Sequence, residues 1–91
     1  MPRPTRPSPR ELTPSWPDES ATDAAGEVAR RLAANLRSVI GERSIRSVAA
    51  HAGVNHATLL AILAGRVWPD AYTIATLESA LGADLWPGRV E

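Results

Sequence analysis

Residues 45–64, IRSVAAHAGVNHATLLAILA, carry the pattern from which the fold of this protein follows. Two short helical patterns are separated by Gly53, and glycine adopts a positive φ without steric penalty, so it suits a tight turn. Ala49 is small enough to let a second helix cross closely, and Val54 follows the turn as an apolar plug. Leu59 and Ile62, three residues apart, can fasten the second helix to a core. The spacing therefore predicts a helix-turn-helix.

A longer helix is predicted before this pair. Apolar residues recur there at spacings of three and four, which is typical of an amphipathic helix, at Val28, Leu32, Leu36, Val39 and Ile40. Gly41 is a plausible stop, so this helix should run from Ala24 to about residue 40. Ser44 and Asn55 are natural N-caps for the two helices of the pair.

Two more helices are predicted after the pair. A fourth helix starts at Asp70 and closes at Gly82, and Asp84 can cap a final turn that contains Leu85 and Trp86. No strand pattern appears anywhere in the sequence. The sequence thus predicts an all-α fold of five helices, with the domain spanning residues 24–88.

Residues 1–23 differ in composition from the rest of the chain. They hold most of the prolines and only two large apolar residues, Leu12 and Trp16. Such a segment should not bury enough apolar area to offset its ordering entropy, so we expect a flexible tail. The early Arg3, Arg6 and Arg10 leave open a second interpretation, a basic arm that reaches into a DNA minor groove.

Composition excludes several classes of function. There is no cysteine, and His51 and His56 lack the acidic cluster that a metal site would need, so we expect no metal and no cofactor. No secretory signal and no apolar run of about 20 residues is present, so we expect a cytoplasmic protein without membrane contact. No paired carboxylates, nucleophile–base pair or phosphate loop appears. We therefore expect neither an enzyme nor a small-molecule substrate.

The chain resembles a known family over about 65 residues. The match is without gaps from Ser44 to Leu85, with a Gly-x-x-x-Pro link from Gly65 to Pro69 and a helix end at residues 80–82, Ala-Leu-Gly. On these residues the protein resembles the XRE (Cro-type) helix-turn-helix family of DNA-binding proteins. The resemblance implies a compact five-helix, lambda-repressor-like domain.

The resemblance also implies where DNA would bind. The N-terminal part of the third helix would enter the major groove, with base contacts from Asn55, His56, Ala57, Thr58 and Ala61. Phosphate contacts would flank that helix, from Arg43, Ser44, Arg46, Ser47 and Arg66. Asn55 also has a purely structural interpretation as an N-cap, and the arginines have one as solvated surface residues.

Several apolar residues suggest a further contact surface, for a partner protein or a second copy: Leu60, Leu63, Trp68, Leu85 and Trp86. Alternatively, the first helix or the tail around Trp16 covers Leu60 and Leu63. One helix-turn-helix contacts few base pairs, so a homodimer on a palindromic site is expected.

Two functional hypotheses remain. The first is a sequence-specific transcriptional regulator, in particular a repressor, that binds double-stranded DNA; the polar helix start and the flanking arginines favour it. The second is a protein-interaction module, such as an antitoxin or adaptor, that keeps the same fold. It is favoured by the formal net charge of zero and by Ile45 and Leu63, which replace the glutamine and glutamate of many family members.

Overall fold

Four α-helices and one 3-10 turn make up residues 6–90, the part of the chain that the computed structural model describes. The 3-10 turn η1 spans Pro9–Leu12, and the helices are α1 (Ala24–Ile40), α2 (Ile45–Ala52), α3 (His56–Leu63) and α4 (Ala71–Leu81). No strand occurs within the described range. The prediction of an all-α fold is confirmed for these residues.

Each helix begins at a polar side chain that satisfies a free backbone N–H of its first turn. The caps are Asp23 for α1, Ser44 for α2, Asn55 for α3 and Asp70 for α4. The turn between α2 and α3 has Gly53 at φ 71°, which is the left-handed conformation that the sequence predicted for it. The predicted starts of all four helices are thus confirmed to within a residue.

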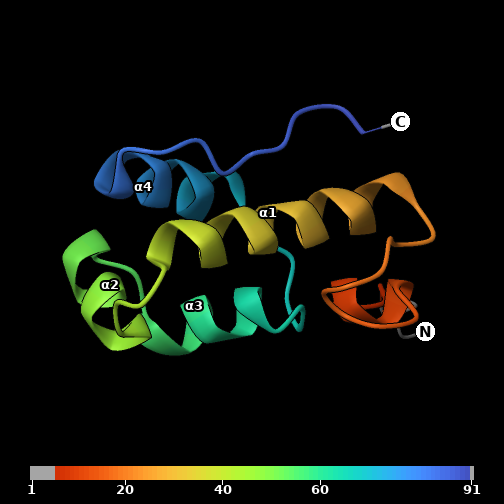
Figure 1. Ribbon diagram of the computed structural model, residues 1–91, viewed down its shortest axis with the longest axis horizontal. Coiled ribbons are helices and arrows are strands. Elements are labelled where there is room, and N and C mark those ends of the chain that lie inside the picture. The colour runs from red at the N-terminus through yellow and green to blue at the C-terminus, as the bar shows by residue number, and fades with distance from the viewer. Residues whose placement is uncertain (1–5, 91) are drawn as a thin grey trace, which may run out of the picture.

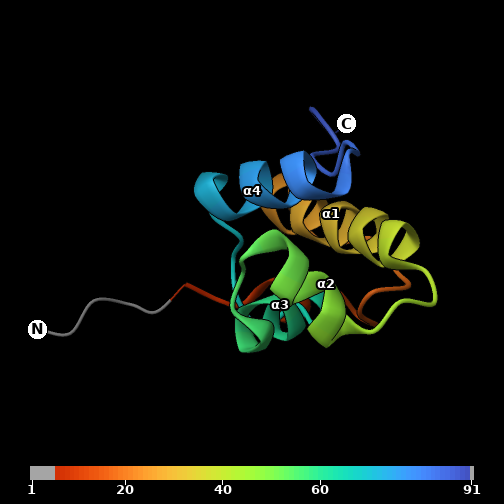
Figure 2. The same ribbon diagram turned by 90° about the vertical axis from the view of Figure 1, so that its left-hand side faces the viewer.

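Helix α1 forms the middle of the molecule. Figures 1 and 2 show α4 on one side of it and the α2–α3 pair on the other. Its residues Leu32 and Leu36 are fully buried among Leu59 of α3, Leu77 of α4 and Leu85. Each fully buried leucine of this kind contributes about 1.5–3 kcal/mol through the removal of apolar surface from water. The core that orients α3 is therefore built mainly on one face of α1.

The predicted fifth helix is absent. After α4 the chain continues without helix through residues 83–90. The carboxylate of Glu78 accepts hydrogen bonds from the backbone N–H groups of Leu85 and Trp86, and the Asn35 amide donates to the Leu85 carbonyl. Side chains of α4 and α1 thus satisfy this backbone, and Pro87 follows at once without an N–H of its own. The expectation that Asp84 caps a helical turn is wrong.

The N-terminal segment is packed rather than free. Residues 7–22, named here the N-terminal strap, run beside α1 and beyond the end of α3 (Figure 1). Pro9 is buried, the Arg10 N–H donates to the Gly65 carbonyl, and the Trp16 indole donates to the Leu63 carbonyl at 3.0 Å. The expectation of a flexible tail over residues 1–23 is wrong for the strap, and residues 1–5, including Arg3, lie outside the described residues.

The physical reason is that a few residues outweigh the average composition. Prolines restrict the unfolded chain, so a proline-rich segment loses less entropy when it is ordered. One tryptophan buries as much apolar surface as several small residues, and Trp16 supplies that surface here.

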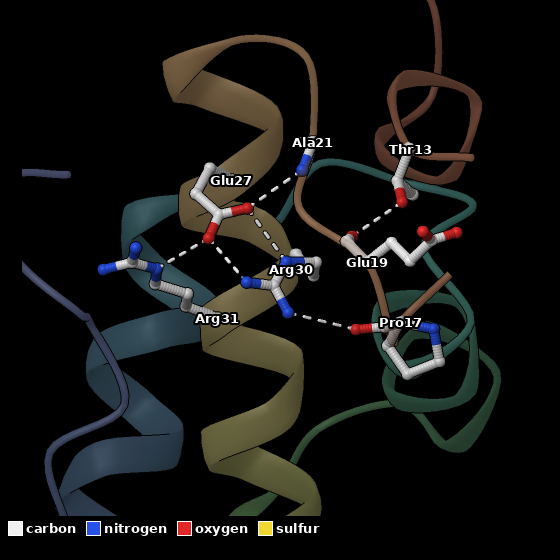
Figure 3. A network of polar contacts seen from close by, with 7 residues as sticks. All are labelled: Thr13, Pro17, Glu19, Ala21, Glu27, Arg30 and Arg31. Carbon is white, nitrogen blue, oxygen red and sulfur yellow. Dashed lines mark hydrogen bonds and ion pairs between the residues drawn. The ribbon is translucent and has the colours of Figure 1, made fainter. Parts of the chain in front are cut away.

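A buried carboxylate ties the strap to α1. Figure 3 shows the Glu27 carboxylate receiving the Ala21 N–H and the guanidinium groups of Arg30 and Arg31. Arg30 in turn donates to the Pro17 carbonyl of the strap at 3.2 Å. The Arg30 guanidinium, with the Ala21 N–H and Arg31, holds the pKa of the Glu27 carboxyl far below its ordinary value, although burial acts in the opposite direction. The contact is therefore formed by the ionised carboxylate.

Candidate nucleic-acid interface

The helix-turn-helix pair has the packing that its sequence predicted. Ala49 and Val48 of α2 are buried, and Leu59 and Ile62 of α3 lie in the core beside them. The N–H of Val54 donates to the Ala49 carbonyl at 3.0 Å and closes the turn. The face of α3 that packs on the core is thereby settled, and its opposite face at the N-terminal end is left exposed.

The first turn of α3 presents small polar groups. The Asn55 side-chain oxygen accepts the N–H groups of Ala57 and Thr58, so the capping role of Asn55 is confirmed. The amide NH₂ of Asn55 keeps its donor capacity, because capping uses only the oxygen. Ala57 and Thr58 are exposed, whereas His56 and Ala61 are half-buried. The structure thus brings four of the five predicted base-contact residues to the N-terminal end of α3, three of them exposed, while Ala61 lies in the second half of the helix.

The predicted phosphate-contact residues divide into two groups. Arg46, Ser47 and Arg66 are exposed, and neither arginine forms an ion pair within residues 6–90. Arg43 instead donates to the carbonyls of Val39 and Ile40, where it satisfies the C-terminal end of α1. The Ser44 hydroxyl accepts the Ser47 N–H as the cap of α2. The capping role of Ser44 was predicted from the sequence. The structural role of Arg43 at the end of α1 was not.

The charge of this region differs from that of the whole chain. Residues 43–69 contain three arginines and no acidic residue, so all ten acidic residues lie outside them. Both α2 and α3 lie in this stretch, and their N-terminal ends add partial positive charge. The neutral net charge therefore conceals a locally basic surface.

Two of the residues expected on a partner surface are buried. Leu63 is 4% exposed and Leu85 is fully buried, so the expectation that they form a surface is wrong. The sequence left open that the first helix or the tail around Trp16 covers Leu63. In the structure the strap covers the end of α3, where the Trp16 indole donates to the Leu63 carbonyl. Leu60 is 38% exposed and Trp86 is 54% exposed, while Trp68 is half-buried and donates its indole N–H to the Pro7 carbonyl.

Sequence reasoning missed two contacts between segments far apart in the chain. His51 of α2 contacts the Ala80 carbonyl of α4 through Nε2, at 3.1 Å. Gly65 lies directly beneath the Trp16 ring, where no side chain fits. The sequence places Gly65 just after the third helix, but Trp16 lies almost 50 residues earlier in the chain. No local pattern connects the two residues.

Within residues 6–90, no helix has both the length and the apolar character needed to cross a membrane. The same residues contain no group of three histidine, aspartate or glutamate side chains that could hold a metal ion.

The fold thus defines a class, a small all-α protein with a capped helix-turn-helix pair. Comparison with models of known protein families and with curated proteins finds no match to this chain.

Proposed function

We propose that this protein binds double-stranded DNA sequence-specifically through α3 and acts as a transcriptional regulator, in particular as a repressor. The observation that carries the proposal is the exposed polar first turn of α3, which lies in a stretch that holds three arginines and no acid. The resemblance of residues 44–85 to XRE-type proteins points the same way. No catalytic role and no cofactor form part of the proposal.

In this mechanism the N-terminal end of α3 enters the major groove, which is wide enough to admit a helix. The Asn55 NH₂ donates to a base acceptor or a phosphate, and Thr58 offers a second polar contact. Ala57 and Ala61 allow the close approach that contact with a thymine methyl requires. Arg46 and Arg66 bind phosphates beside the groove and set the register of the helix.

Two copies of the protein are proposed to bind the two halves of a palindromic site. One α3 helix contacts only a few base pairs, and two helices about one helical turn apart provide the missing specificity.

The test is fluorescence anisotropy with the intact protein, using duplexes selected from a randomised library and duplexes from the region upstream of its gene. Asn55→Asp is the decisive variant, because aspartate still caps the helix but removes the amide donor and adds a negative charge. Arg46→Ala tests the phosphate contact. Arg89→Ala is the matched control, since it removes one arginine from the C-terminal segment, away from α2 and α3.

We expect nanomolar binding to a selected site, lost in Asn55→Asp and unchanged in Arg89→Ala. Arg46→Ala should reduce the slope of log K against log salt by about one, because one phosphate contact is lost. Failure to enrich any sequence, together with equal weak binding by all variants, would refute the proposal.

A second function, that of a protein-interaction module, is favoured by a separate observation. Trp86 and Trp68 line an apolar hollow that includes no residue of α3, and DNA binding gives that hollow no role.

A further inference from the structure

An apolar trough crosses the N-terminal half of α1. Ala25 and Val28 of α1 line it together with Trp68 and Trp86. Its central hollow has a volume of about 240 Å³, and hollows of about 280 and 410 Å³ adjoin it on either side. Figure 1 shows the C-terminal segment, which contributes Trp86, running along this half of α1.

The trough is an unpartnered apolar surface within the described part of the chain. Trp86 is 54% exposed although it is among the largest apolar side chains of the protein. The exposed ring of Trp86 and the half-buried ring of Trp68 line the same hollow, so two large aromatic side chains are available to one ligand. Tryptophan and arginine are also the residues most enriched among the energetically dominant contacts of protein interfaces.

Arginines stand at both ends of the trough. Arg6 lies over the Trp68 ring, 5.9 Å from its centroid, and Arg89 lines the opposite end beside Trp86. Neither forms an ion pair within residues 6–90. The one acidic residue along the lining, Asp23, is held as the N-cap of α1 by the Gly26 N–H at 2.7 Å. Asp23 lies in the same hollow as Arg6, so the lining as a whole carries one net positive charge, and an occupant that is apolar in the middle with acidic groups beside it complements this surface.

We propose that this trough binds an acidic amphipathic helix of a partner protein. The central hollow is smaller than the roughly 300–1,000 Å³ of typical small-molecule pockets, and it opens into neighbours on both sides. An elongated, shallow surface matches one apolar helix face with anchors at intervals of one turn. The arginines supply charge complementarity to glutamates that flank that face.

This site does not include the first turn of α3, although Trp68 at its edge lies two residues from the proposed phosphate contact Arg66. The trough lies on the first two turns of α1, whereas α2 begins beyond the other end of this 17-residue helix. At 1.5 Å per residue those ends are about 25 Å apart. A helix in the trough therefore leaves the first turn of α3 free, and failure of one proposal does not imply failure of the other.

The experiment uses the full chain and three labelled synthetic peptides of about 18 residues, long enough to form a helix. The first places leucines on one helical face and glutamates elsewhere. The second replaces the glutamates with lysines, and the third keeps the composition of the first but scrambles the leucine spacing. Binding is followed by fluorescence anisotropy, and circular dichroism verifies that each protein variant is folded.

We expect the acidic peptide to bind with micromolar affinity and the other two to bind at least about tenfold more weakly. Trp86→Ala should weaken the acidic peptide by about tenfold while its DNA affinity stays unchanged. The double variant Arg6→Glu/Arg89→Glu should reverse the preference, so that the lysine peptide binds best. Asn55→Asp, which tests the DNA surface, should leave peptide binding as in the wild type.

Equal affinity for the acidic and lysine peptides, or a preference that survives the double charge reversal, would overturn the proposal. So would two other outcomes. If the molecular mass of the protein in solution doubles as its concentration rises, and Trp86→Ala stays monomeric, the trough binds a second copy of the chain. Binding to anionic lipid vesicles without binding to the acidic peptide would assign it to a membrane surface.

Discussion

Gly65 joins the strap to the end of α3. Its φ of 71° lies in the left-handed region, and a Cβ at this position would lie 2.6 Å from Trp16 Cε2 and 2.9 Å from Arg10 Cβ. Gly53 has the same φ of 71° but nothing within 4 Å of its would-be Cβ. A side chain at Gly53 would therefore meet backbone strain alone, whereas a side chain at Gly65 would meet both backbone strain and a steric conflict.

We expect Gly53→Ala to lower the free energy of unfolding by about 1 kcal/mol, through backbone strain alone. Gly65→Ala should cost about 3–4 kcal/mol, because the methyl group also displaces the Trp16 ring. Urea denaturation followed by circular dichroism measures both.

The control is the same pair of substitutions in a Trp16→Ala background. There the cost of Gly65→Ala should fall towards that of Gly53→Ala, since the ring that conflicts with the methyl group is gone and only the contact with Arg10 Cβ remains. Equal costs for the two glycines in the wild-type background would show that Trp16 does not pack on Gly65.

At the scale of elements, the strap and α1 are joined by one carboxylate. Glu27 is 7% exposed and receives hydrogen bonds from α1 and from the strap (Figure 3). Its ionisation contributes stability because its pKa in the folded state lies far below the ordinary value of 4.5.

We expect Glu27→Gln to lower the free energy of unfolding at neutral pH by about 2 kcal/mol, because the half-buried Arg30 and the Ala21 N–H lose their charged acceptor. A depressed carboxyl pKa gives stability that is complete above the unfolded-state pKa and is lost as the pH falls below it. The difference between wild type and variant should thus be constant above about pH 5 and shrink towards pH 3. Urea denaturation at several pH values measures it, and a difference that grows on acidification would contradict this origin.

At the scale of the whole molecule, the strap completes a small core. A domain of this size buries only about 60% of its unfolded surface, so each covering side chain matters. Trp16 and Pro9 cover the end of α3 and the link that follows it, while α1 and α4 cover the rest (Figure 1).

We expect a chain that lacks residues 1–22 to lose about 3 kcal/mol or more of stability, because it loses the buried Pro9, the half-buried Trp16 and the hydrogen bonds of the strap to Gly65, Leu63 and Glu27. For a domain of this length, that loss lowers Tm by more than about 10 °C. Differential scanning calorimetry measures it. An unchanged Tm would instead favour the flexible tail that composition alone suggested.

Local signals predicted much of the candidate DNA surface. The N-cap role of Asn55 and the left-handed Gly53 followed from residue types at particular positions, since a cap and its partners are separated by two or three residues. Arg43 was predicted as a phosphate contact, but it also binds the end of α1, a hydrogen-bond assignment that its position did not specify.

The sequence by itself determined the four helices, the caps at which they begin and the inward positions of Leu59 and Ile62, because helical periodicity, caps and glycine turns act over a few residues. The tertiary structure decided which segments cover that framework. Trp16 packs on Gly65, Glu78 takes the place of a fifth helix in satisfying the C-terminal backbone, and Leu63 and Leu85 are buried. These contacts join residues far apart in the chain or depend on which segment fills a gap in the core. The stabilisation that these contacts provide depends on the shape and the polar groups of a surface that exists only after the helices have packed. The spacing of residues along the chain does not specify that surface.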